Sequence, residues 1–340
     1  MTSHQKFNVA VVGATGIVGQ EFVKLLKERD FPLGELKLFA SQKSAGTWIP
    51  SGEKKFKVAE LKPGCFKECT VAFFSAGADI SKEWAPRAIE EGCFVIDNSS
   101  AFRMEMNIPL VVPEVNSHRI PKKSDISIIA NPNCSTIQLV MALKPLHDAF
   151  DLKNVTVATY QSVSGAGSEG IDELLQQTKE HLENTKLTQK VFPHPIAFNN
   201  IPQIDIFDES GFTFEEKKVI LETQKILNLP NLDVSVTAVR TPTIHSHSEA
   251  VWIELGKEVS RTEVVDCLKK VPGITIIDDP NRSAYPLNRD ALGKDDVFIG
   301  RIRRDLKNPR RWLMWIVSDN VRKGAALNGI QIAEKLLELD

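Results

Sequence analysis

The first part of the chain alternates strand-like and helix-like apolar segments. Residues 7–12 form a nearly continuous apolar run, which is typical of a strand buried on both faces of a parallel sheet. From Ile17 to Leu26 the apolar residues recur at helical spacing. Further strand-like runs lie at 36–40, 71–75, 93–97 and 126–130, and a helix is expected at about 80–90. The pattern predicts an α/β domain with a Rossmann-like, doubly wound parallel sheet.

After Phe150 the pattern changes, because valine-rich strand segments follow one another with fewer helices between them. We expect an α+β second domain with a mostly antiparallel sheet, its strands at 155–160, 234–239, 250–255, 274–277, 297–302 and 312–317. Residues 186–214 are rich in Pro and Asn and predict a long loop or interface arm. The apolar stripe from Arg322 to Leu337 predicts an amphipathic helix that packs on the first domain.

These patterns predict two domains. The first spans residues 1–132 and is completed by the C-terminal segment 320–340, and the second spans residues 133–319. With 42 basic and 44 acidic side chains, the net charge of −2 gives no indication of a nucleic-acid or anionic-membrane partner. The absence of an apolar signal segment and of any run of 18 apolar residues predicts a soluble, cytoplasmic protein. The five cysteines show no disulfide framework or zinc-site spacing.

One cysteine has a distinctive setting. Cys134 follows the apolar run 126–130 and the polar corner Asn131-Pro132-Asn133, and apolar residues at helical spacing begin directly after it. We therefore expect Cys134 at or near a helix N-terminus, where unpaired N–H groups and the helix dipole favour a thiolate. The pattern is equally compatible with a nucleophile and with a small buried hydrophobic residue.

A glycine-rich turn joins the first strand to the first helix. Its sequence, GATGIVG (13–19), has the spacing G-x-x-G-x-x-G, and a strand, glycine turn and helix in that order can hold a phosphate group. The second strand is followed by Ser41, Lys43 and Ser44 and not by the carboxylate that NAD enzymes direct at the ribose. A cation among hydroxyls suits a 2′-phosphate, so NADP(H) is the predicted cofactor.

Two more strand ends carry candidate ligand-binding residues. Ser75, Ala76 and Gly77 are small enough to let a cofactor approach the backbone, and Arg103 ends the NSSAFR segment (98–103). Ligands of doubly wound sheets lie beyond the carboxyl ends of the strands, so Arg103 is either an anion ligand near Cys134 or a surface arginine.

The segment from Val239 to Val251 gathers chemically active side chains. If the segment is an extended strand, His245, His247 and Glu249 share one face, and such a set can bind zinc in a metal hydrolase. In a second interpretation one histidine is the acid/base partner of Cys134, and Arg240 binds a substrate carboxylate. A third assigns the histidines to hydrogen bonds within a loop. No Asp/His cluster elsewhere supports the zinc site, which would also leave the glycine turn unexplained. The remaining histidines have no such setting: His4, His118, His147, His181 and His194.

Taken together and in order, seven segments resemble aspartate-semialdehyde dehydrogenase over about residues 7–338. They are GATGIVG (13–19), NSSAFR (98–103), VPEVN (112–116), NPNCST (131–136), QSVSGAG (161–167), HSE (247–249) and KGAALN (323–328). The resemblance implies a glyceraldehyde-3-phosphate-dehydrogenase-like fold and a homodimer or tetramer. It also implies NADPH-dependent conversion of L-aspartyl 4-phosphate to L-aspartate 4-semialdehyde and phosphate, in the pathway to lysine, threonine, methionine and diaminopimelate.

The resemblance also implies a role for individual residues. Cys134 would form the acyl thioester, His247 would act as acid/base, and Gln161 would orient the substrate. Arg240 would hold the α-carboxylate and Glu222 the amino group of the substrate. The residues implied at the phosphate site are Arg103, Asn133 and Lys225. Those implied or expected at the cofactor are Gly13, Thr15, Gly16, Ile17, Val18, Ser41, Lys43, Ser44, Ser75, Gly77, Ser164, Gly165 and Asn320, and no metal is implied.

Two positions depart from the family pattern. Lys43 stands where many members carry arginine, which retains the charge but lacks the planar guanidinium, and Ser246 stands where many have glycine. Two rival functions remain. N-acetylglutamyl phosphate reductases perform the same chemistry on an acylated amine, but Glu222 favours a free ammonium group. An inactive NADP-binding regulator would have no reason to keep Cys134, Gln161, Arg240 and His247 together.

Overall fold

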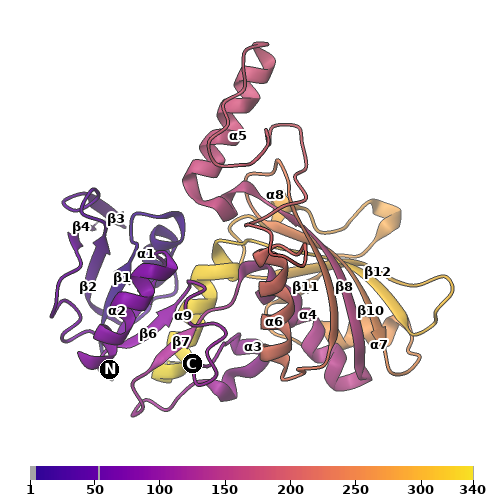
Figure 1. The fold of residues 1–340 in the computed structure, drawn as a ribbon. Coiled ribbons are helices and arrows are strands. Elements are labelled where there is room, and N and C mark those ends of the chain that lie inside the picture. Colours follow the sequence, from indigo (N-terminus) through magenta and orange to yellow (C-terminus); the bar gives the residue numbers. More distant parts are fainter. Residues whose placement is uncertain (1–4, 53, 340) are drawn as a thin grey trace. The chain divides into compact units, whose positions relative to one another are not determined.

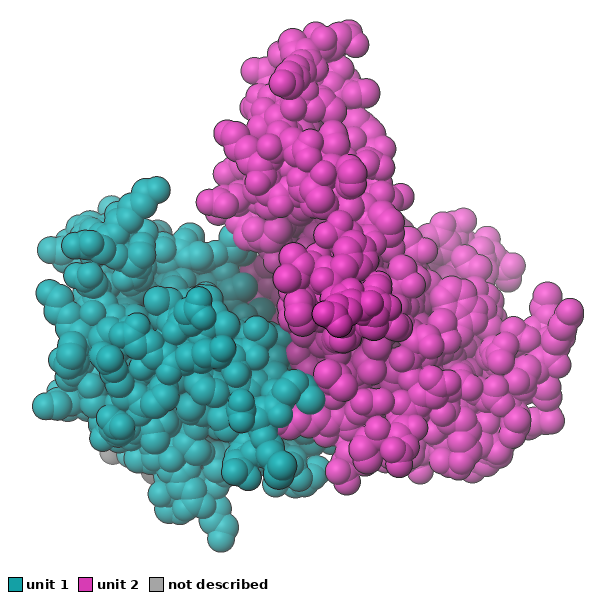
Figure 2. All heavy atoms as spheres, in the orientation of Figure 1, with its two compact units in different colours: residues 1–132, 325–340 teal, residues 133–324 magenta. Residues whose placement is uncertain are grey.

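A computed structural model describes residues 5–52 and 54–339, and it divides the chain into two compact units (Figure 2). Unit 1 comprises residues 1–132 and 325–340, and unit 2 comprises residues 133–324. The first four residues, including His4, lie outside the described part. Within that part, no helix combines the length and apolarity needed to cross a membrane.

Unit 1 contains a seven-stranded sheet in the order β3-β4-β2-β1-β5-β6-β7, and all neighbouring strands are parallel except β3 and β4 (Figure 1). Its strands are β1 (Phe7–Val12), β2 (Leu33–Ala40), β3 (Trp48–Ser51), β4 (Lys54–Glu60), β5 (Val71–Phe74), β6 (Phe94–Asp97) and β7 (Ile128–Ala130). Its helices are α1 (Ile17–Glu28), α2 (Ala78–Glu90), α3 (Pro113–Asn116), the short η1 (Ser117–Arg119) and α9 (Leu327–Leu337). The predicted parallel sheet is confirmed.

The two faces of this sheet bury different sets of side chains. Alternate residues such as Val9 and Val11 pack with Phe22 of α1 and Ile330 of α9 in one apolar cluster. The residues between them join a second cluster with Trp84 of α2. Helices therefore cover both faces, which explains why the strands are nearly continuous apolar runs. Of the expected C-terminal helix, the part that forms α9 packs on this sheet, whereas residues up to Gly324 belong to unit 2.

Unit 2 contains a six-stranded sheet in the order β11-β12-β13-β10-β8-β9. Its strands are β8 (Leu152–Gln161), β9 (Asp233–Arg240), β10 (His247–Leu255), β11 (Ile274–Ile276), β12 (Val297–Arg304) and β13 (Arg311–Ser318). The pairs β8/β9 and β11/β12 are parallel and the other three are antiparallel, so the expected mostly antiparallel sheet is confirmed. The helices are α4 (Cys134–Phe150), α5 (Gly167–Leu182), α6 (Phe214–Leu227), α7 (Arg261–Lys269) and α8 (Asn288–Ala291), with the short η2 (Val163–Ala166), η3 (Pro280–Arg282) and π-helical η4 (Arg322–Ala326).

The structure corrects the expected helix content of the second domain. Helices α5, α6 and α7 were not predicted, although α6 and α7 each begin with a capping box, formed by Thr213 with Glu216 and by Ser260 with Glu263. The strands β3 and β4 were also missed, because β4 is rich in lysine and lies next to the sheet edge. The loop predicted for residues 186–214 is confirmed over 186–213, which contain no helix or strand, and Ile201 within it pairs with Arg240 at the end of β9. Helix α5 extends away from the rest of unit 2 (Figure 1).

Candidate active site

Cys134 is the first residue of α4, as the sequence predicted. Its N-cap is Asn133, whose side-chain oxygen accepts hydrogen bonds from the N–H groups of Ser135 (2.9 Å) and Thr136 (3.4 Å). A Cβ built on Gly324 would lie 2.9 Å from the Cβ of Cys134. The helix start therefore favours a thiolate, and glycine at position 324 leaves room for the cysteine.

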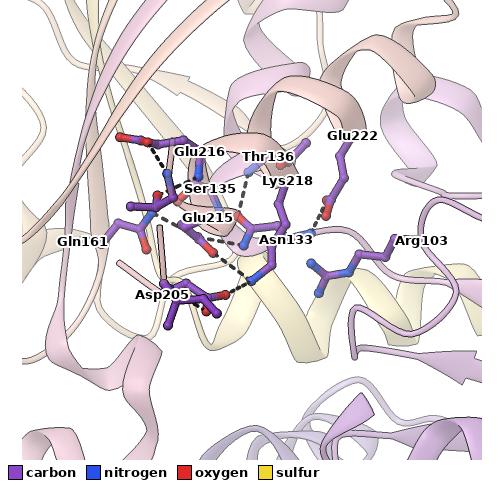
Figure 3. Close-up of polar contacts among 12 residues, drawn as sticks. Arg103, Asn133, Ser135, Thr136, Gln161, Asp205, Glu215, Glu216, Lys218 and Glu222 are labelled. Carbon is purple, nitrogen blue, oxygen red and sulfur yellow. Dashed lines mark hydrogen bonds and ion pairs between the residues drawn. The ribbon is translucent and has the colours of Figure 1, made fainter. Parts of the chain in front are cut away.

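Helix α6 holds the start of α4 through two carboxylates (Figure 3). Oε2 of Glu222 accepts the backbone N–H of Asn133 at 2.7 Å. Oε1 of Glu215 accepts the side-chain amides of Asn133 (2.8 Å) and of Gln161 (3.2 Å). Residues 215 and 222 are seven apart, so both side chains lie on one face of the helix. Lys225 lies on the same helix and is half-buried.

His247 begins β10 and is fully buried. Its Nδ1 accepts the backbone N–H of Ser162 at 3.1 Å, so the proton of the neutral ring is assigned to Nε2. Nε2 has no hydrogen-bond partner among the described residues. Burial, and secondarily the charge of Arg240, lower the pKa of His247 to about 3. The ring is therefore a neutral N–H donor at physiological pH.

Arg240 ends β9 and lies close to His247. Its Nη1 donates to the carbonyl of Ser162 at 2.7 Å, and a Cβ built on Gly165 would lie 2.9 Å from that nitrogen and 3.3 Å from Nε2 of His247. Burial lowers the pKa of Arg240, while the charges of Glu215 and Cys134 raise it. An arginine remains protonated despite such a shift. Cys134, Glu215 and His247 therefore all interact electrostatically with one buried cation.

Asn320 connects the residues behind His247. Its Oδ1 accepts hydrogen bonds from the hydroxyls of Ser162 and Ser164 (both 3.2 Å) and from the N–H of Ser246 (2.9 Å). Ser164, Gly165 and Asn320 were expected at the cofactor. In unit 2 they form one cluster with His247 and Arg240.

The extended reading of residues 245–249 is wrong. Ser246 has a φ of +67°, in the left-handed region, and β10 begins only at His247. His245 therefore does not share the strand face of His247 and Glu249. Among the described residues no group of three or more His, Cys, Asp or Glu side chains is arranged to hold a metal. Serine is strained in this left-handed conformation, which glycine would adopt freely.

In unit 1 the glycine turn forms a close-packed corner at the carboxyl ends of β1 and β5. Gly13 has a φ of +80°, and a Cβ on it would lie 2.7 Å from the carbonyl oxygen of Ser75. A Cβ on Gly19 would collide with the carbonyl oxygen of Gly13. Helix α1 begins at Ile17 without a side-chain cap, so Ile17 and Val18 belong to a first helical turn whose N–H groups suit a phosphate. Thr15 and Gly16 form the turn before it, and the N–H of Gly16 donates to the carbonyl of Gly13 at 3.0 Å. Gly77 likewise caps α2, and a Cβ there would meet nothing within 4 Å.

The other predicted residues of unit 1 lie at the ends of neighbouring strands. Ser41, Lys43 and Ser44 form the turn after β2, with the Lys43 side chain exposed. Arg103 is largely buried, and it donates to the carbonyls of Asn131 (2.9 Å) and Asn98 (2.8 Å), which follow β7 and β6. Arg103 is therefore an ordered side chain and not a solvated surface arginine.

Sequence reasoning missed two residues of this site. Glu215 was overlooked because α6 was not predicted, although its spacing of two helical turns from Glu222 could have revealed it. Ser162 acts chiefly through its backbone N–H and C=O, which carry no sequence signal.

Both halves of the chain match known protein families. Residues 8–123 match "Semialdehyde dehydrogenase, NAD binding domain", and residues 143–323 match "Semialdehyde dehydrogenase, dimerisation domain". The aspartate-semialdehyde dehydrogenase of Aquifex aeolicus is 49% identical over 334 residues, 98% of each chain. The enzyme of Bacillus subtilis is 48% identical over 341 residues, also 98% of each chain.

Solved structures show the same likeness. Aspartate semialdehyde dehydrogenase II of Vibrio cholerae, complexed with ASA, has a TM-score of 0.95 and 46% identity, covering 98% of this chain and 99% of that chain. The aspartate semialdehyde dehydrogenase of Candida albicans, solved with NADP, has a TM-score of 0.76 and 29% identity with the same coverage.

Proposed function

Because this chain belongs to the aspartate-semialdehyde dehydrogenase family, we propose that it converts L-aspartyl 4-phosphate to L-aspartate 4-semialdehyde and phosphate, using NADPH and a Cys134 thioester. This reaction belongs to the pathway to lysine, threonine, methionine and diaminopimelate. The observation that carries the proposal is the grouping within unit 2 of a helix-start cysteine, a buried arginine and a neutral histidine with an available Nε2–H.

The first chemical step is acyl transfer to sulfur. The Cys134 thiolate attacks the acyl carbon, a C–S bond forms, and the bond from carbon to the phosphate oxygen breaks as phosphate leaves with the electron pair. The proposed phosphate ligands are Arg103, Asn133 and Lys225. Arginine and lysine charges compensate the charge on the departing phosphate.

The second step is reduction of the thioester. NADPH, when bound, supplies the hydride. The resulting tetrahedral alkoxide on Cys134 collapses to the aldehyde, the C–S bond breaks, and the thiolate is regenerated. The departing phosphate takes up one proton from solvent in the first step and the hydride step needs none, so a neutral His247 ring suffices. Its Nε2–H stabilises the oxyanion in both steps by a hydrogen bond.

Substrate recognition is assigned to residues around the nucleophile. Arg240 has further guanidinium N–H groups beyond the one bonded to Ser162, and these suit a substrate α-carboxylate. Glu222 would attract the substrate ammonium group. Gln161, held by Glu215, would orient the acyl group.

The chain carries residues that fit a dinucleotide. We assign this role to residues 1–132 with the C-terminal helical segment, and catalysis and dimerisation to residues 133–319. The close-packed Gly13–Gly19 corner and the uncapped start of α1 suit a pyrophosphate, with Ser75 and Gly77 beside it. Ser41, Lys43 and Ser44 would bind the 2′-phosphate of NADP, and Ser164, Gly165 and Asn320 the nicotinamide end.

The proposed assembly is a homodimer built on the dimerisation domain, with a tetramer as the alternative. On β8, Tyr160 is 38% exposed and its ring lies 5.3 Å from that of Trp315. On the 183–213 loop, Phe198, Ile206 and Phe207 are more than half exposed. Exposed apolar side chains of this kind support the sheet surface around Tyr160 and the 183–213 loop as interface candidates. The five cysteines are free thiols, which agrees with a reducing cytoplasm.

One assay tests the function. Reduction of NADP or NAD is followed with aspartate semialdehyde or N-acetylglutamate semialdehyde, with and without phosphate. We expect phosphate-dependent reduction of NADP with aspartate semialdehyde. A preference for the acetylated substrate would favour the rival reductase, and the absence of turnover with either substrate would favour the regulator.

A further inference from the structure

The proposed catalysis leaves one fully buried acidic residue without a role. Glu249 lies on β10 two residues after His247, so both side chains are on the same face of the strand. It stands opposite Thr159 of β8 on one side and Ile316 of β13 on the other. Neither of its carboxyl oxygens has a hydrogen-bond partner among the described residues, and no ion pair there includes it. Burying an ionisable side chain without a hydrogen-bond partner costs free energy, so we expect Glu249 to have a function.

Glu249 belongs to a polar layer directly beneath the proposed catalytic residues. Gln138 follows Cys134 by one turn of α4, Thr159 precedes Gln161 by two residues on β8, and Glu249 follows His247 by two on β10. The fourth member, Ser318, is paired with His247 across β10 and β13. All four side chains are 0% exposed. The elements that carry the proposed catalytic residues, α4, β8 and β10, therefore also carry this polar layer, together with β13.

Contacts link the layer to the site. The hydroxyl of Ser318 donates to Oε1 of Gln138 at 2.6 Å, which directs the amide nitrogen of Gln138 away from Ser318. Nε2 of Gln161 donates to the hydroxyl of Thr159 at 3.3 Å. The Gln138 amide also interacts with Glu249 and lowers its pKa, but Gln138 Nε2 is itself without a partner within hydrogen-bond distance. Burial outweighs this weak contact, and the pKa of Glu249 is raised well above its usual value.

The charge state of Glu249 matters because of the ionisable residues that lie nearest to it. The inward-facing neighbours on β8 and β13, namely Val157, Thr159, Ile316 and Ser318, are not ionisable, and the nearest ionisable residues along α4 and β10 are Cys134 and His247. A carboxylate here would have no cation beside it and would oppose a thiolate on Cys134. A carboxylic acid has nearly the shape of a glutamine amide, and it can both donate and accept.

We propose that Glu249 is a positioning residue, an uncharged carboxylic acid that packs between Gln138 of α4 and Thr159 of β8 beneath Cys134, Gln161 and His247. The role rests on the proposed function of those three residues. The acid keeps the helix start and the two strands in register without adding negative charge to the nucleophile's surroundings.

The test compares the wild type with Glu249→Gln and the apolar Glu249→Leu. Glutamine should keep kcat within about threefold, whereas leucine should lower kcat by about tenfold or more, with little change in either KM, because the buried Gln138 amide loses the polar side chain that it faces. Equal kcat values in all three proteins would overturn the positioning role. If the leucine protein does not fold, Gln138→Met replaces it, with the same expected loss of kcat.

Two measurements address the charge directly. The infrared spectrum of the wild type minus that of Glu249→Gln should show the carbonyl stretch of a protonated carboxyl group, and the appearance of carboxylate bands instead would overturn the proposal. The pH profile of Cys134 alkylation by iodoacetamide should superimpose in these two proteins, whereas a shift to lower pH in Glu249→Gln would reveal a lost negative charge. The infrared result needs no turnover, so it stands even if the proposed activity fails.

Discussion

The backbone N–H of Ser162 donates a 3.1 Å hydrogen bond to Nδ1 of His247. A backbone amide cannot give up its proton, so the ring nitrogen must accept. An imidazolium would direct a second N–H at this donor, inside a buried site that already contains the Arg240 charge. The contact therefore fixes the tautomer of the neutral His247 ring and leaves its Nε2–H without a partner among the described residues; the acid/base role that the family resemblance implies for His247 stays a prediction.

Replacement of the donor should slow the reaction without unfolding the protein. For His247→Asn we expect kcat to fall by about two to four orders of magnitude, as is typical when a group acting on the transition state is removed. Steady-state kinetics with aspartate semialdehyde, phosphate and NADP measures the loss. A loss below about threefold would remove His247 from the mechanism.

The lowered pKa of His247 also predicts how stability depends on pH. Between pH 6.5 and about 3 the unfolded chain binds a proton at this residue and the folded chain does not, so the free energy of unfolding falls as pH falls through this window. From pH 7 to pH 5 the loss from this one group is about 2 kcal/mol. Urea unfolding at pH 7 and pH 5 measures the loss in the free energy of unfolding, which should be about 2 kcal/mol smaller in His247→Asn than in the wild type. Equal losses in the two proteins would contradict the neutral, buried imidazole.

Glu215 should matter to catalysis although no family motif marks it. In Glu215→Ala the buried amides of Asn133 and Gln161 lose their shared acceptor, and Arg240 loses a nearby negative charge. We expect kcat/KM to fall by about 10- to 100-fold, the effect of losing hydrogen bonds to a charged acceptor. Glu258→Ala, which removes an exposed glutamate of the same unit, serves as the control and should retain wild-type kinetics. Similar kinetics in both variants would exclude the organising role of Glu215.

Lys43 should distinguish the two nicotinamide cofactors. If its charge meets the 2′-phosphate, Lys43→Ala raises the KM for NADP by about tenfold and leaves the KM for NAD unchanged. Lys57→Ala removes another exposed lysine of unit 1 and should change neither value. An equal rise for both cofactors in Lys43→Ala would place the lysine elsewhere than at the 2′-phosphate.

Local patterns predicted those parts of the fold and site that depend on neighbouring residues. The strand, glycine turn and helix at residues 7–28 and the helix beginning at Cys134 are examples, because apolar periodicity and capping act over a few residues. The common face of His245 and Glu249, on which the zinc interpretation depended, does not form, since Ser246 adopts a left-handed conformation that its side chain does not favour. The contacts of Glu215 and of the Ser162 backbone could not be predicted, because they join segments distant in sequence.

The role of Cys134 as the acyl carrier is the central claim. The most direct measurement is phosphate-dependent reduction of NADP by aspartate semialdehyde in the wild type and in Cys134→Ala, whose folding is verified by circular dichroism. The account predicts turnover in the wild type and none in the alanine variant, because without the sulfur no thiohemiacetal or thioester forms. Full activity in Cys134→Ala would contradict it.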